Sequence, residues 1–148
     1  MSGVLHVLLH MAESSAPMTS EMLARIINSN PVVVRRIMGG LRQRGYVQSE
    51  KGHGGGWTLS CDLKCVTLRD VYQALGCPQL FAIGNRSDDT RCLVEEVVNA
   101  ELSEALGEAE ARLLIRFGEI TLATLSADFH ARLKQRGGSS ASFEQVHG

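Results

Sequence analysis

The sequence lacks a long apolar run, since none approaches the roughly 20 residues that a membrane-spanning helix requires. Residues 4–9 (VLHVLL) are apolar, but no basic region precedes them and no small-residue cleavage site follows, as a signal peptide would need. Aromatic residues are scarce, at 5%, whereas hydrophobic residues reach 44% and charged residues 21%. This composition is typical of a folded chain of one-domain size. We expect a cytoplasmic protein with no membrane partner.

An excess of one charge is also absent, because 15 Lys and Arg stand against 16 Asp and Glu, a net charge of −1. This balance argues against indiscriminate binding to nucleic acid. The charges are unevenly distributed, however. Residues 1–60 have six bases and three acids, a net of +3, while residues 61–148 have nine bases and thirteen acids, a net of −4. A basic first part and an acidic second part predict two different tasks on one chain.

The motifs of common enzyme classes are missing as well. The sequence has no nucleophile motif, no phosphate-binding glycine loop of the right form and no paired carboxylates with a clear task. Residues 52–57 (GHGGGW) have the glycine content of an oxyanion-hole loop, but the strand–turn–helix segment that would accompany such a loop is absent. The sequence therefore predicts a protein that is not an enzyme.

Apolar residues recur every three or four positions in the first 45 residues, which predicts three helices. The first covers residues 4–12, and the second begins after the N-cap Thr19. The third covers residues 31–44, with Asn30 as its N-cap and Pro31 at the first helical position. The inward face of the first helix is expected to consist of Leu5, Leu8, Leu9 and Ala12, and that of the third of Val34, Ile37, Met38 and Leu41.

A short hairpin is predicted after these helices. Residues 46–50 and 57–59 alternate like strands, and the glycine-rich segment 51–56 between them suits a tip. A helix over residues 68–75, a long helix from Leu93 and a last helix capped by Thr121 follow. The predicted fold class is mainly α with a small β-hairpin, that is, a winged helix-turn-helix followed by a long C-terminal helix.

The outward face of helix 31–44 is polar or basic, as in a helix that enters the major groove of DNA. Arg35 and Arg36 lie in its first two turns, where an arginine can bind a guanine or a phosphate. Val32 points outward and could contact a thymine methyl group. The glycines at positions 39–40 lower helix propensity by roughly 1 kcal/mol each. They predict that a backbone, of DNA or of another helix, approaches closely.

Two flanking segments complete the predicted DNA-binding surface. Thr19 and Ser20 begin the preceding helix, whose N-terminal N–H groups could hold a phosphate, and Lys51 and His53 lie at the hairpin tip. Each signal has an ordinary alternative, because a pair of arginines is usually solvated surface and a glycine-rich hairpin is usually only a turn. An interaction module that keeps the winged fold without binding DNA is a further alternative. The order and spacing of the signals together favour DNA binding.

Three segments resemble the BadM/IscR-type winged helix-turn-helix regulators, namely NPVVVRRIMGGLRQRGYV (30–47), SEKGHGGGWTL (49–59) and VTLRDVYQAL (66–75). The resemblance covers nearly the whole chain, from residue 4 to about residue 133. It implies a homodimer in which the long helix (93–117) crosses to the partner, with two recognition helices on a palindromic operator in double-stranded DNA. It also implies a repressor, because most relatives repress.

By position, the resemblance places Val32, Val33 and Arg35 where relatives present base-contacting side chains, and Lys51 and His53 on the wing tip. The full set of predicted DNA-binding residues is Thr19, Ser20, Asn30, Val32, Val33, Arg35, Arg36, Arg42, Lys51, His53 and Gly54. We expect three parts: a winged helix-turn-helix domain (1–76), an effector loop with dimerisation helices (77–136) and a flexible tail (137–148).

The cysteines differ from the pattern of the family's cluster-binding members, which have three closely spaced cysteines before and at the start of the long helix. This chain has only Cys92 there; Cys77 lies fifteen residues earlier, and Cys61 and Cys65 follow the wing. We therefore expect the cluster-free branch of the family, with no iron–sulfur cluster, no other cofactor and no metal. The alternative is an iron–sulfur cluster whose thiolate ligands come from both chains of a dimer.

Two hypotheses for regulation remain open. Cys92 lies beside a predicted helix N-terminus and after Arg91, and both features favour a reactive thiolate. An inert, half-buried cysteine is the ordinary alternative. The second hypothesis is a small-molecule effector bound near residues 76–91. A zinc site that uses Cys61 and Cys65 ranks below both hypotheses.

Overall fold

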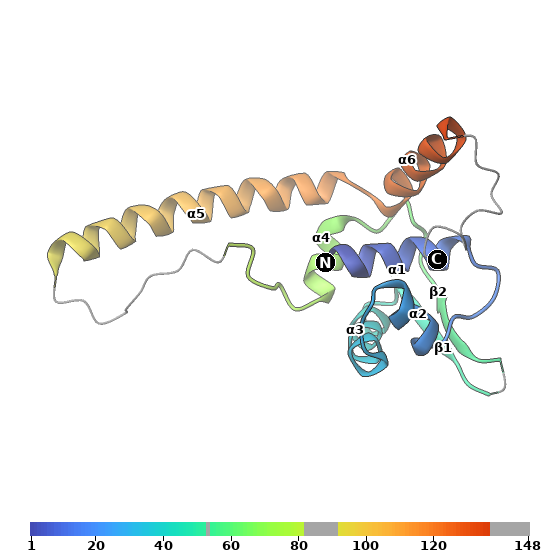
Figure 1. Cartoon of the computed structure of the whole chain (residues 1–148). Coiled ribbons are helices and arrows are strands. Elements are labelled where there is room, and N and C mark those ends of the chain that lie inside the picture. The colour runs from blue at the N-terminus through green and yellow to red at the C-terminus, as the bar shows by residue number, and fades with distance from the viewer. Residues whose placement is uncertain (53, 82–91, 137–148) are drawn as a thin grey trace.

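A computed structural model describes residues 1–52, 54–81 and 92–136. Within these ranges the elements are α1 (Ser2–Glu13), α2 (Ser20–Ile26), α3 (Pro31–Gln43), β1 (Val47–Glu50), β2 (Gly56–Leu59), α4 (Leu68–Ala74), α5 (Leu93–Glu119) and α6 (Leu122–Gln135). The predicted fold class, mainly helical with one small hairpin, is confirmed (Figure 1). The expected tail and most of the expected effector loop lie outside the described residues.

One apolar core joins α1, α2, α3, β1, α4 and α6 into a compact body. Its buried members are Val4, Val7, Leu8, Met11, Leu23, Ala24, Val34, Met38, Leu41, Val47, Val66, Val71 and Leu122. The predicted inward face of α3 agrees with this core, except that Ile37 is only half-buried. The predicted face of α1 is wrong for Leu5, Leu9 and Ala12, because the structure turns Val4, Val7 and Met11 inward instead. Apolar residues cover more than half of the circumference of α1, so periodicity alone did not identify which of them are buried.

Side-chain caps fix where three of the body's helices begin. Thr19 accepts a hydrogen bond from the Met22 N–H at 3.2 Å, and Asn30 accepts one from the Val32 N–H at 2.7 Å. Thr67 and Asp70 form a reciprocal capping box at the start of α4. Asn28, between α2 and α3, has a φ of +47°, a left-handed conformation that asparagine tolerates better than most residues. These local contacts set the tight turn of the helix-turn-helix.

The two strands form an antiparallel hairpin in which Val47 pairs with Leu59 and Glu50 with Gly56. A second backbone pairing ties β2 to the segment before α2, because Met18 and Trp57 exchange hydrogen bonds of 2.9 and 3.0 Å. The hairpin is therefore attached to the start of α2 as well as to the end of α3.

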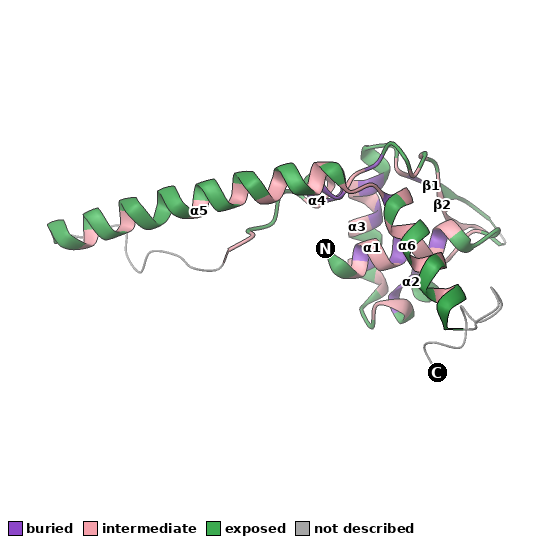
Figure 2. Cartoon of the chain, turned by 90° about the horizontal axis from the view of Figure 1, so that it is seen from above, coloured by how far each residue is buried: buried purple, intermediate pink, exposed green. Residues whose placement is uncertain are grey.

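Helix α5 extends away from the body, as Figures 1 and 2 show. None of its residues, all of which the structure describes, is buried. Its C-terminal part contacts the body, where the Tyr72 hydroxyl lies 3.5 Å from the Glu110 carboxylate and the rings of Phe117 and Tyr72 meet edge to face with centroids 6.4 Å apart. Gly118 allows close packing there, since a Cβ at this position would lie 3.1 Å from the guanidinium carbon of Arg69. Large apolar side chains in the first part of this helix are exposed.

Helix α6 returns the chain to the body. Thr67 and Thr121 form an isolated antiparallel bridge, Leu122 is fully buried, and His130 contacts Glu13 at 3.0 Å. The last described helix therefore packs against the first helix of the chain. The division of the chain into parts at residue 76 stays a prediction.

The two adjacent glycines of α3 have different surroundings. A Cβ at Gly40 would lie 2.8 Å from the carbonyl oxygen of Ala74, so α4 occupies the space beside it. A Cβ at Gly39 would meet no described atom within 4 Å. The backbone that was expected to approach these glycines is therefore that of α4, and it approaches Gly40. Gly39 faces open space.

Candidate nucleic-acid interface

The outward face of α3 is exposed along its first two turns. Val32 is 66% exposed, Arg35 and Arg36 are also exposed, and Val33 is half-buried. On the opposite side Val34 and Met38 are buried in the core. A helix anchored by its apolar side and open on its basic side has the shape of a recognition helix.

The hairpin tip lies on the same side of the body as α3, the lower side in Figure 1, with α5 and α6 on the upper side. Lys51 is exposed at the end of β1, and Gly54 turns the chain with a φ of +84°. Arg42 of α3 donates a 3.3 Å hydrogen bond to the Ser49 hydroxyl of β1, which connects α3 directly with the wing. His53, also predicted here, lies outside the described residues.

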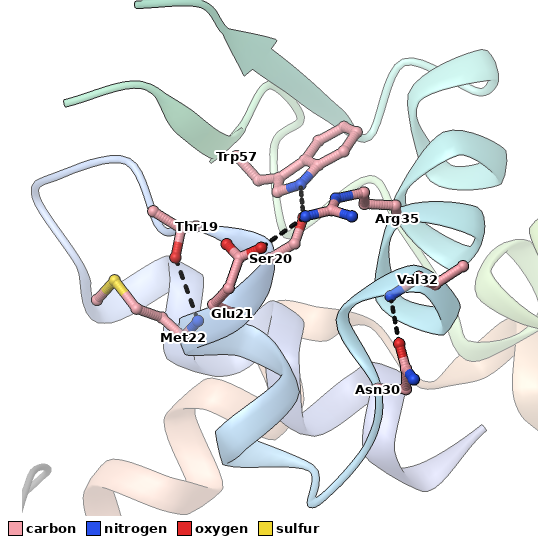
Figure 3. A network of polar contacts seen from close by, with 8 residues as sticks. All are labelled: Thr19, Ser20, Glu21, Met22, Asn30, Val32, Arg35 and Trp57. Carbon is pink, nitrogen blue, oxygen red and sulfur yellow. Dashed lines mark hydrogen bonds and ion pairs between the residues drawn. The ribbon is translucent and has the colours of Figure 1, made fainter. Parts of the chain in front are cut away.

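Three predicted DNA-contacting side chains accept hydrogen bonds from other groups of the protein. The oxygens of Thr19 and Asn30 cap α2 and α3, as described above. Ser20 is buried, at 7% exposure, and its hydroxyl accepts a 3.0 Å hydrogen bond from the indole Nε1 of Trp57 (Figure 3). These residues position the two helices, and the N-terminus of α2 remains next to the exposed face of α3.

Glu21 is the residue of this surface that the sequence-based prediction missed. Its carboxylate lies 2.5 Å from Nη2 of Arg35, and the two side chains are 54% and 55% exposed (Figure 3). An acid in the first turn of α2 suits the helix dipole, but this local preference does not identify its partner. The partners lie fourteen positions apart in the sequence, which hid their contact, although two helices joined by a tight turn bring such positions together.

The four cysteines, all of which the structure describes, form no disulfide. Cys92 is the N-cap residue of α5 and is exposed; its thiol makes no capping hydrogen bond, but the N–H groups of Glu95 and Val94 lower the pKa of this thiol. Burial raises the pKa of Cys61, and the nearby Asp62 adds to that effect. Arg91, the other expected activator of Cys92, lies outside the described residues.

The thiols present do not fit an iron–sulfur cluster held by one chain. Such clusters are typically held by four cysteine thiolates, and Cys92 is the only cysteine at the start of α5. Within the described ranges no group of three or more His, Cys, Asp or Glu side chains is placed to hold a metal ion. The positions of the described cysteine, histidine and carboxylate groups therefore do not support an iron–sulfur cluster or a zinc site at Cys61 and Cys65.

Two surface hollows lie elsewhere than the predicted effector site. One, of about 510 Å³, is open and lies between residues 61–64 and α6. The other, of about 260 Å³, lies between the end of α1 and β2. Most of the predicted site, residues 82–91, lies outside the described part of the chain. No described helix combines the length and apolar content needed to cross a membrane.

Residues 1–128 match the Rrf2 family, which is described as an iron-dependent transcriptional regulator. Over 60 residues the chain is 38% identical to YwgB of Bacillus subtilis (strain 168), a candidate HTH-type transcriptional regulator. That match covers 40% of this chain and 38% of the relative, so it spans well under half of the relative's length.

Solved structures with the same fold cover most of the chain. A candidate transcriptional regulator from Lactobacillus plantarum is 23% identical, with a TM-score of 0.70 over 92% of this chain and 96% of that one. IscR of T. potens is 17% identical, with a TM-score of 0.60 over 86% and 82%. CymR, the global cysteine regulator of B. subtilis, is 20% identical, with a TM-score of 0.53 over 85% and 91%. At these identities the likeness shows the fold alone.

Proposed function

This chain belongs to the Rrf2 family of transcriptional regulators, and we propose that it works as a homodimeric repressor that binds a palindromic operator. It is a DNA-binding regulator and not an enzyme. In the proposal α3 enters the major groove and the wing, residues 50–57, contacts the backbone or the minor groove. The protein would act in the cytoplasm, where it meets DNA.

The observation that most supports this proposal is the exposed face of α3 beside the wing. Val32 and Arg35 would reach base edges, since an arginine can bind guanine with two hydrogen bonds and a valine can pack against a thymine methyl group. Arg36, Arg42 and Lys51 would neutralise phosphates. The N-terminus of α2, which begins at Ser20, would approach the backbone of the DNA.

The exposed length of α5 supports the dimer. Its 27 residues span about 40 Å at 1.5 Å per residue. Its large exposed apolar side chains are Leu93, Val94, Val97, Val98, Leu102 and Ile115. Soluble monomers rarely leave a helix of this length with apolar side chains in water, and the same helix of a second copy would cover them.

Binding-site selection from random duplex DNA tests the DNA-contacting part of the proposal. The wild-type protein should enrich a sequence with two-fold symmetry, and Arg35→Ala should lower affinity for that duplex about 10- to 100-fold. Arg36→Ala should weaken binding to all duplexes and reduce the salt dependence, as expected for a lost phosphate contact. An interaction module that does not bind DNA would enrich no sequence, and that result would rule out an operator-binding regulator.

Cys92 is our candidate for redox modulation. It is exposed at the N-terminus of a helix, and its lowered thiol pKa favours the nucleophilic thiolate. Its oxidation at the N-terminal end of the proposed dimerisation helix would change how the two helices of the dimer pack and so how the two DNA-binding domains are placed. If Cys92→Ser leaves the response of operator binding to peroxide unchanged, Cys92 is not the sensor. A small-molecule effector near residues 76–91 would then be the remaining candidate.

A further inference from the structure

The contact between Glu21 and Arg35 joins the two helices of the helix-turn-helix on the face that is proposed to meet DNA. Glu21 occupies the first turn of α2 and Arg35 the second turn of α3, and their side chains meet outside the core (Figure 3). Within the described residues 1–52 this is the one arginine–carboxylate ion pair. The neighbouring Arg36 has no acidic partner among the described residues.

The backbone beneath Glu21 is firmly held. Thr19 caps the helix, Ser20 is buried against the indole of Trp57, and Met18 is paired with β2. The backbone of Glu21 is therefore held beside α3, where its carboxylate is within reach of Arg35.

The carboxylate neutralises the charge of Arg35, a side chain that could otherwise bind a phosphate of the DNA backbone. Non-specific DNA binding depends on such charges, so the pair weakens it. A guanidinium has five N–H donors, and donors that Glu21 leaves free can still reach a base edge. The same contact thus suppresses phosphate binding and orients Arg35 toward bases.

We propose that Glu21 is a specificity-determining residue of this regulator, which acts by holding Arg35 for base contact and away from phosphates. The proposal rests on the DNA-binding function proposed above. An exposed ion pair contributes little to folding stability. The effect of Glu21 should therefore appear in DNA discrimination rather than in the stability of the fold.

The test compares Glu21→Gln with a matched control, Asp128→Asn. Asp128 pairs with Arg132 on α6 at 2.9 Å, with both side chains exposed, so the control removes the same charge from a similar pair away from α3. Affinities are measured for the duplex selected by the wild-type protein and for a shuffled duplex, over a range of salt concentrations. Thermal unfolding confirms that both variants remain folded.

We expect Glu21→Gln to reduce the ratio of specific to non-specific affinity about tenfold, the discrimination of roughly one well-placed arginine contact. Binding to the shuffled duplex should strengthen, and its salt slope should steepen by about 0.9 as Arg35 gains a phosphate. Asp128→Asn should leave the ratio unchanged. An unchanged or increased ratio for Glu21→Gln, or an equal decrease for Asp128→Asn, would overturn the proposal.

A double-mutant cycle decides whether Glu21 acts through Arg35. In an Arg35→Ala background, Glu21→Gln should no longer change either the ratio or the salt slope. A full effect in that background would mean that Glu21 acts independently and would also overturn the proposal. Failure of the wild-type protein to select any duplex would overturn the proposed function itself, whereas normal selection without coupling would overturn only the role of Glu21.

Discussion

Trp57 donates a 3.0 Å hydrogen bond from its indole Nε1 to the buried hydroxyl of Ser20, which links the wing to the first turn of α2 (Figure 3). The backbones of Trp57 and Met18 pair beside this bond. The side-chain hydrogen bond and the backbone pairing together join the wing to the helix-turn-helix. Because Glu21 follows Ser20, the same hydrogen bond helps to position the backbone of Glu21, whose carboxylate contacts Arg35 of the recognition helix.

Trp57→Phe should lower the free energy of unfolding by about 1 to 2 kcal/mol, since it leaves a buried hydroxyl without its donor. Ser20→Ala removes the other partner and serves as the comparison. The double variant should lose less than the sum of the single losses, because both changes break the same bond. Circular dichroism is the suitable measurement, as Trp57 is the only tryptophan. Strict additivity would show that the bond contributes nothing.

Gly40→Ala should destabilise the protein by about 1 to 3 kcal/mol, because the new methyl group would overlap the Ala74 carbonyl oxygen. Gly39→Ala is the matched control at the next residue of the same helix. It should stabilise the protein by about 0.5 to 1 kcal/mol through higher helix propensity. Chemical denaturation measures both values. Equal effects at the two positions would contradict the close packing of α3 against α4.

Cys92 should react with iodoacetamide at lower pH than Cys61. The N–H groups at the start of α5 lower the pKa of Cys92, so its thiolate forms as pH rises through a value below that of an ordinary thiol. Burial raises the pKa of Cys61, so its thiolate appears only at higher pH. Mass spectrometry of labelled peptides from pH 6 to pH 9 follows each site separately. Faster labelling of Cys61 at neutral pH would contradict this order.

Val98→Glu should dissociate the proposed dimer, because it places a charge on the exposed apolar side of α5. Ser103→Glu adds the same charge to an exposed position away from these apolar side chains and should leave the dimer intact. Sedimentation velocity distinguishes the two outcomes. If the wild-type protein sediments as a monomer at micromolar concentration, α5 is not a dimerisation helix.

Interactions within a few residues could be predicted from the sequence. Thr19 and Asn30 were identified as N-caps, the start of α3 at Pro31 was correct, and the glycine-rich segment did separate two strands. These features depend on side chains that contact their own or the next turn, so the local order of residues contains the information. The exposed side of α3 followed from its helical periodicity.

The pairing of distant surfaces was decided only by the tertiary structure. The sequence did not indicate that Glu21 would contact Arg35 or that Trp57 would donate a hydrogen bond to Ser20. It also did not indicate that α1 would bury the side that contains Val4. Such contacts depend on the angle and distance at which whole elements pack, and many residues spread along the chain determine these together. The sequence by itself therefore determined the elements and the exposed recognition helix, whereas packing decided which charges on that helix are free to meet DNA.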